Sequence, residues 1–180
     1  MARRTGQRPT KRSSKATRWL DDEEEAAWRA IATLMLKLRW ALECQLERDA
    51  GLSFIEYHTL ARLSEEPNHT LRMSELAAIT NQSLSRLSHL VKRLESRGLL
   101  RREADAADGR FTNAILTGEG YARLVASAPA HAETVRALVI DPFSAAELQQ
   151  LREASERMLA RIDARQNDDR MASQPKRDGR

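Results

Sequence analysis

The 180-residue chain has a single cysteine, Cys44, and only 7 glycines and 5 prolines. One thiol cannot form a disulfide within the chain, which excludes a disulfide scaffold and fits a reducing compartment. No apolar run approaches the roughly 18 residues of a membrane span, and no apolar stretch follows the basic N-terminus as in a secretory signal. We therefore expect a soluble, cytoplasmic protein with one core and two terminal extensions.

Catalytic signatures are also lacking. The sequence contains no nucleophile elbow, Walker loop, zinc-protease motif or dinucleotide fingerprint. The pair of carboxylates that comes nearest to a catalytic arrangement is Asp105 and Asp108. It falls in a polar segment where nothing would raise a pKa for acid–base work. The histidines show no close ligand pair for a metal ion; they are His58, His69, His89 and His131. We expect neither an enzyme nor a bound metal or cofactor.

Charge is distributed unevenly along the chain, although the net charge is only +4. Residues 1–18 carry seven basic residues and no acidic one. Residues 19–164 carry 18 basic and 23 acidic residues, and within them residues 83–102 carry six basic residues and one acidic residue. Of the 30 basic residues 25 are arginine, the side chain suited to phosphate and guanine. Residues 1–18 and 165–180 have little to bury, so both are expected to be disordered tails. The basic tail would serve as an arm on DNA phosphates or as a solubilising appendage.

The two ends of the body are predicted to be long helices, at about 21–49 and within 118–164. Asp21 and Glu24, and again Ser144 and Glu147, have the spacing of a capping box. Apolar residues follow at steps of three and four: Trp28, Ile31, Met35, Leu38 and Leu42 in the first, and Leu148, Leu151, Met158 and Ile162, with Ser155 in the seam, in the last. Such seams fit packing within one chain or between two chains.

The middle of the chain predicts a winged helix-turn-helix over about residues 53–117. A helix begins at Ser53 and stops before Pro67, a short helix covers 74–79, a turn covers 80–82, and a helix over 83–97 ends at Gly98. Strands are expected at 99–103 and 111–116, and then a helix from about Thr117 that is kinked or broken at Pro129. The predicted fold class is mainly α with a small β-hairpin wing, flanked by long N- and C-terminal helices.

The helix over 83–97 has the pattern of a DNA recognition helix. One face is apolar and is expected to be buried: Leu84, Leu87, Leu90, Val91 and Leu94. The other face is small and basic: Ser85, Arg86, Ser88, His89, Lys92 and Arg93. Small hydroxyls allow close approach to base edges, Arg86 can bind guanine, and the later basic residues can meet phosphates. The backbone amides of Gln82 and Ser83 are expected to hold a phosphate. Without its supporting short helix, the same pattern would describe a solvated amphipathic helix.

The hairpin is predicted to supply a second contact. Asp108 and Gly109 form a turn dipeptide, in which the Asp108 side chain accepts hydrogen bonds from nearby amides. Arg110, just after the turn, could reach into a minor groove. Arg101 and Arg102 at the base of the first strand would add phosphate contacts or remain simply exposed.

These segments resemble the MarR family of bacterial transcriptional regulators. Asp108, Arg110, Leu116 and Thr117 fill the family's wing signature, and the segments 74–77, 83–87 and 94–100 are also similar. The resemblance covers about residues 21–164. It implies a homodimer formed by intertwined terminal helices. It also implies a palindromic double-stranded DNA operator with half-sites about one helical turn apart.

The resemblance further implies a small aromatic or phenolic ligand that binds between the dimerisation helices and the DNA-binding lobe and releases the DNA. Five residues would border such a cleft, or else serve only in packing and dimer contacts: Trp28, Arg39, Trp40, Tyr57 and His58. Another branch of the family senses peroxide through a cysteine near the start of the first helix. Cys44 lies near the end of that helix, so a buried and inert thiol is expected. Zinc sensing, also known in the family, is not expected.

The function predicted from the sequence is that of a DNA-binding regulator, a repressor released by a small ligand. Two alternatives remain at this point. A winged helix can bind proteins without DNA, although the shared basic face of Arg86, Lys92, Arg93 and Arg110 argues against it. A redox-sensing regulator would use Cys44.

Overall fold

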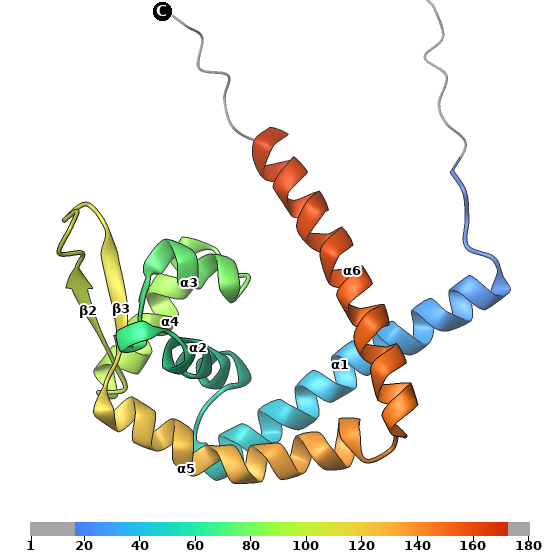
Figure 1. The fold of residues 1–180 in the computed structure, drawn as a ribbon, viewed down its shortest axis with the longest axis horizontal. Coiled ribbons are helices and arrows are strands. Elements are labelled where there is room, and N and C mark those ends of the chain that lie inside the picture. Colours follow the sequence, from blue (N-terminus) through green and yellow to red (C-terminus); the bar gives the residue numbers. More distant parts are fainter. Residues whose placement is uncertain (1–16, 173–180) are drawn as a thin grey trace, which may run out of the picture. The chain divides into compact units, whose positions relative to one another are not determined.

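The computed structural model describes residues 17–172, which divide into two units within the first helix, after Lys37. Figure 1 shows the chain coloured along its length. Most of the expected N-terminal tail, residues 1–16, and the last part of the expected C-terminal tail, residues 173–180, lie outside the described residues.

The first unit contains the outer part of α1 (Asp22–Ala50). Its start is fixed by the expected capping box, in which the Glu24 N–H donates to Asp21 Oδ1 (2.9 Å) and the Asp21 N–H donates to Glu24 Oε2 (3.1 Å). Several apolar side chains of this stretch are exposed, among them Trp28 (53%) and Met35 (55%). The seam predicted from the sequence is therefore bare along the outer part of α1.

The second unit holds the rest of the chain. Its first part is a lobe of α2 (Phe54–Glu65), a 3-10 turn (Pro67–His69), β1 (Thr70–Arg72), α3 (Met73–Ile79), α4 (Leu84–Ser96), β2 (Leu100–Ala104) and β3 (Thr112–Leu116). Next come α5 (Gly118–Val135), a π-helical turn (Arg136–Ile140) and α6 (Ala145–Ala172). The three strands form an antiparallel sheet in the order β1-β3-β2. The expected fold class, mainly helical with a small wing, is confirmed. None of the helices between residues 17 and 172 is long and apolar enough to cross a membrane.

Three details differ from the sequence-based expectation. Strand β1, which pairs Leu71 with Ala114, was not expected because three residues are too few to show alternation. Helix α5 is not broken at Pro129: the alanines on both sides favour the helix, which offsets the hydrogen bond and the space that the proline ring costs. Helix α6 continues to Ala172, past the expected end near Ala164, because no glycine or proline interrupts it.

The core lies in the lobe and consists mainly of leucines. Fully buried members come from every helix of the lobe: Leu60 and Leu63 in α2, Leu76 in α3, and Leu87, Val91 and Leu94 in α4. Burial of this apolar surface orients α4, since one face of the helix is committed to the core.

Helix α5 is seated against the lobe by a close approach at Gly120. A Cβ atom there would lie 2.1 Å from the Leu99 carbonyl oxygen and 2.7 Å from Leu116 Cδ1, so only glycine fits. Thr117 caps the same helix: its hydroxyl accepts from the Gly120 N–H (3.0 Å) and donates to the Gly98 carbonyl (2.6 Å). The wing and the start of α5 are thereby joined at one point.

Candidate nucleic-acid interface

Helix α4 begins after a tight turn that the sequence identified correctly. Asn81 adopts a left-handed conformation (φ 51°), and the Ser83 hydroxyl caps α4 by accepting from the Arg86 N–H (3.3 Å). The Gln82 N–H donates to the Ala77 carbonyl (2.8 Å). The expectation that the Gln82 amide is available to a phosphate is therefore wrong, because the turn already uses it.

The face of α4 opposite the core carries the small and basic side chains named from the sequence. Ser85, Arg86, His89 and Lys92 are exposed, and Ser88 is half-buried. Within residues 17–172 no ion pair involves Arg86 or Lys92. A shallow hollow of about 410 Å³ is lined by His89, Lys92, Arg93 and Ser96. This face presents positive charge to whatever approaches α4.

Arg93, on the edge of that face, is already paired. Its Nε lies 3.5 Å from Glu56 Oε1, and the other carboxylate oxygen lies 3.4 Å from an Arg97 nitrogen. The Glu56 side chain is only 8% exposed and also accepts from the Ser53 N–H (3.0 Å). The sequence identified Glu56 only as a cap of α2, because its contacts with α4 are tertiary.

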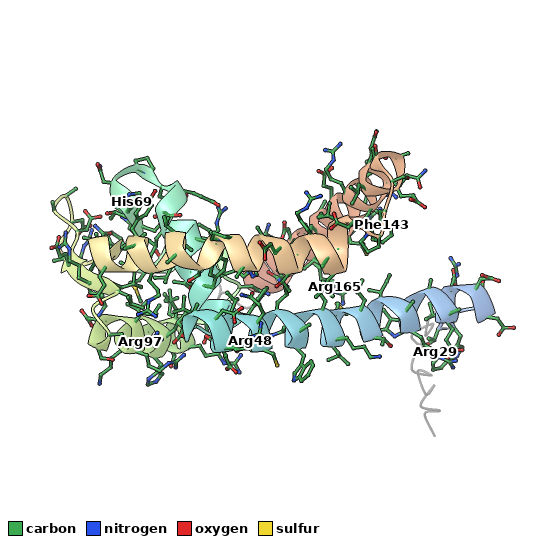
Figure 2. All side chains as sticks on the ribbon, turned by 90° about the horizontal axis from the view of Figure 1, so that it is seen from below. Arg29, Arg48, His69, Arg97, Phe143 and Arg165 are labelled. Carbon is green, nitrogen blue, oxygen red and sulfur yellow. The ribbon has the colours of Figure 1, made fainter. Side chains whose placement is uncertain are left out.

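Arg97 extends this link from α4 to the end of α1. Its guanidinium donates to the Gly51 carbonyl (2.8 Å), and Figure 2 shows Arg97 at the end of α4. The C-terminal half of α4 is thus held to the junction of α1 and α2 by two arginines that share one buried carboxylate. The carboxylate of Glu56 balances part of the charge of Arg93, whereas Arg86 and Lys92 make no ion pair among the described residues.

The wing turn is organised by Asp108, as expected. Asp108 Oδ1 accepts from the Arg110 N–H (3.1 Å), and the carboxylate receives the Arg110 guanidinium (2.6 Å to Oδ2). This pairing holds the pKa of Asp108 below its ordinary value and raises that of Arg110. The Arg110 side chain remains 86% exposed. Gly109 does not adopt a positive φ, so the turn does not depend on a left-handed glycine.

A second carboxylate, Asp105, fastens the wing to β1. It accepts from the Ala107 N–H (2.9 Å), the Asp108 N–H (3.2 Å) and Arg72 Nε (3.0 Å). These donors, the Ala107 amide first, hold the pKa of Asp105 below its ordinary value. The Arg72 guanidinium also lies 4.7 Å from the centre of the Phe111 ring. Both wing carboxylates therefore stay ionised, which does not suit acid–base catalysis. No motif in the sequence singles out Arg72.

The two arginines of β2 are both paired, Arg102 with a residue of α4 and Arg101 with a residue of its own strand. Arg102 donates to Glu95 Oε2 through two nitrogens (2.6 and 3.0 Å), and Arg101 pairs with Glu103. The Arg102 contacts hold the pKa of Glu95 below its ordinary value. The sequence left two roles open for Arg101 and Arg102, phosphate contact or simple exposure. Phosphate contact would require these ion pairs to open.

Between the start of α4 and the wing lies a groove of about 390 Å³. Its lining combines apolar side chains with three arginines: Met73, Leu84 and Phe111 with Arg72, Arg102 and Arg110. Leu84 is 58% exposed, so the expectation that it belongs to the buried face is wrong. As the first residue of α4, Leu84 lies beyond the edge of the core. The other four apolar residues of that face are buried in the core.

The five residues predicted to border an effector cleft do not form one group. Tyr57 packs on His131 (ring centres 4.5 Å apart), and His58 packs on Phe54 (4.3 Å) and lies edge-on to Tyr57 (6.2 Å). Of these five, only His58 is among the residues lining a hollow of about 540 Å³: Phe54, Ile55, His58, Arg62, Ile79 and Thr80. Burial lowers the pKa of His58 and raises that of Tyr57. Trp40 is 71% exposed, Arg39 is exposed, and Trp28 belongs to the other unit.

The sequence predicted a buried thiol at Cys44. In the structure Cys44 is half-buried, because α1 is covered on one side only in this stretch. Across residues 17–172 no group of three or more histidine, cysteine, aspartate or glutamate side chains is placed to hold a metal ion.

Comparison with known proteins relates this geometry to solved structures. A model described as MarR family matches residues 50–110. Sco3205 of Streptomyces coelicolor, a MarR family transcriptional regulator solved in complex with DNA, is 41% identical, over 82% of this chain and 91% of that one, with a TM-score of 0.77. AbsC, a MarR family regulator of the same organism, is 37% identical, over 82% and 99%, with a TM-score of 0.79. The regulator BldR of Sulfolobus solfataricus is 25% identical, over 78% and 96%, with a TM-score of 0.67. A search of curated proteins found no match.

Proposed function

The chain belongs to the MarR family of transcriptional regulators, and we propose that it is a repressor that binds a palindromic operator as a homodimer and leaves it when a small ligand binds. One observation carries the proposal: the exposed face of α4 and the wing tip present arginine and lysine side chains together, as a DNA-binding winged helix requires. The similar regulator Sco3205, solved with DNA, supports it. We further propose that the protein is not an enzyme and that it acts in the cytoplasm, where the DNA of the proposed operator would lie.

In the proposed complex α4 enters the major groove and Arg110 reaches the adjacent minor groove. Arg86 contacts a base, because it lies near the N-terminus of α4 and makes no ion pair among the described residues. Lys92 contacts phosphate. Arg93, Arg101 and Arg102 keep their internal partners and position the elements, so their removal weakens binding less than removal of Arg86.

A second copy of the chain would cover the bare apolar seams of the terminal helices. In α6 these include Met158 (44% exposed) and Ile162 (50%), and in α1 they include Trp28 and Met35. Large contiguous apolar surface is rarely left open in a soluble protein. Two winged lobes held by such a dimer would meet a two-fold symmetric operator.

The ligand in this proposal is a small aromatic or phenolic compound. The hollow beside His58 supports it, since Phe54 offers a ring for stacking, and Arg62, which pairs with Glu65, would offer a cation to an acidic group if that pair opened. Arg39, Trp40 and Tyr57 do not line this hollow and serve packing or the dimer instead, with Tyr57 packed beside His58.

The test is a mobility shift with DNA from the region upstream of the gene. Loss of a base-reading arginine costs about 1–3 kcal/mol, so we expect Arg86→Ala and Arg110→Ala to weaken binding by about 5- to 150-fold. The matched control is Arg136→Ala, an exposed arginine outside the lobe that pairs with Asp141. If both lobe variants bind as tightly as the control, the proposed contacts are wrong. Binding to a partner protein but to no DNA fragment would favour the protein-interaction alternative.

A further inference from the structure

We propose that Leu84 gives the protein a preference for thymine, by packing against the C5-methyl group of one thymine in each half-site. The proposal rests on the proposed DNA-binding function and adds a base preference to it. It starts from an apolar side chain that the fold leaves outside the core.

Leu84 differs from the other apolar residues of α4. Leu87, Val91 and Leu94 are fully buried, whereas Leu84 is 58% exposed. It is the first residue of the helix, directly after the Ser83 cap. The first residues of a recognition helix are the ones that reach base edges in the major groove. Leu84 therefore stands where a base contact is made.

The surroundings of Leu84 are suited to a DNA strand. Leu84 shares its groove with Met73 and Phe111, and Arg72, Arg102 and Arg110 also line it. Arg110, whose side chain is the most exposed of the three (86%), complements a phosphate backbone, and the apolar side chains have nothing to offer a phosphate. An apolar group from the DNA is thus the matching occupant of this part of the groove.

The C5-methyl of thymine is such a group, and it projects into the major groove. Ser85 and Ser88, the small residues beside Leu84, allow α4 to approach closely enough for contact. Arg86 lies about 200° around α4 from Leu84, nearly on the opposite side, so the methyl contact of Leu84 and the guanine contact of Arg86 would be made on opposite flanks of the helix N-terminus, at separate base pairs.

One alternative assigns Leu84 a purely structural role. With Phe111 only 41% exposed and held by Arg72, Leu84 could buttress the wing without touching a base. The two roles differ in one respect: only the base contact makes the effect of Leu84 depend on the thymine methyl group.

The experiment couples a protein change to a DNA change. The tightest fragment selected from genomic DNA is resynthesised with deoxyuridine in place of each symmetric pair of thymines in turn, which removes the methyl and keeps the hydrogen-bonding edge. Binding is measured for wild type, Leu84→Ala and Leu84→Met. Leu20→Ala, at a leucine of similar exposure (54%) outside the lobe, is the matched control. Thermal unfolding confirms that each variant is folded.

For wild type and Leu20→Ala we expect one deoxyuridine pair to weaken binding by roughly fourfold per half-site, the equivalent of one buried methyl group. Leu84→Ala should lose a similar factor on thymine DNA and show no further loss at that position, whereas Leu84→Met should stay sensitive. Equal sensitivity of Leu84→Ala and wild type overturns the proposal in favour of the wing buttress, and so does insensitivity of wild type at every thymine. If wild type selects no fragment at all, the proposed function fails and the thymine contact fails with it.

Discussion

The winged lobe and the terminal helices use apolar residues in opposite ways. In the lobe, leucines from three helices and the sheet bury one another almost completely, as Leu63, Leu76 and Leu94 do at 0% exposure. In the outer part of α1 and in α6, side chains of the same kind are a third to three quarters exposed, as for Leu36 and Leu151. The lobe is complete within one chain. The terminal helices carry a seam of apolar side chains that remain exposed in the single chain, and the proposed dimer would cover it.

The largest effect is expected when the same leucine-to-alanine substitution is made in the lobe and in a terminal helix. Leu94→Ala should lower the free energy of unfolding by about 2–5 kcal/mol, because it leaves a cavity in a closed core. Leu36→Ala, at a leucine 76% exposed, should change it by less than about 0.5 kcal/mol at low protein concentration. Chemical denaturation measures both. Similar losses in dilute protein would remove the contrast.

A charge placed in the seam should act on assembly and spare the lobe. Ile162→Glu would bury a carboxylate between two copies of α6, so we expect the dimer to dissociate to monomers that remain folded. Sedimentation measures the change. Ala160→Glu, on the opposite face of α6, is the control and should stay dimeric. A dimer that survives Ile162→Glu would show that this seam is not the interface.

The smallest effect concerns the junction of α1, α2 and α5, where His131 Nδ1 lies 3.0 Å from Gln45 Oε1. Burial, and then the charge of His58, lowers the pKa of His131 below its ordinary 6.5. An unfolded histidine keeps the ordinary pKa, so the unfolded chain binds more protons between the two values. Stability is therefore full above about pH 6.5 and falls as the pH drops through the lowered pKa.

Denaturation at pH 7.5 and 5.5 measures this slope. His131→Gln should flatten it and leave the contribution of His58, whereas His89→Gln, at an exposed position of α4, serves as the control. An unchanged slope in His131→Gln would contradict the role of this junction.

The sequence predicted those parts of the fold that depend on local chemistry. Capping pairs such as Ser53 with Glu56, and the glycine after α4, depend on residues a few positions apart, and the structure has them where they were expected. The buried face of α4, apart from Leu84, was predicted correctly for the same reason: helical periodicity is local.

What could not be predicted depends on residues brought together from afar. Whether Leu84 is covered depends on where the core ends, and whether Arg93 is free depends on Glu56, which lies in another helix. Arg72 shows no motif in the sequence, since its partners Asp105 and Phe111 lie beyond the whole of α4. The candidate DNA face could thus be named from the sequence, but its division into unpaired and internally paired arginines could not.

Strand β1 changes what counts as the wing. Strand β1 pairs with β3, and Arg72 donates a hydrogen bond to Asp105. The hairpin is therefore tied to residues that precede the recognition helix in the chain. A wing transplanted from another regulator as residues 100–116 alone would arrive without its anchor. The exchangeable module is discontinuous: the hairpin and residues 70–72 have to travel together, with the recognition helix enclosed between them.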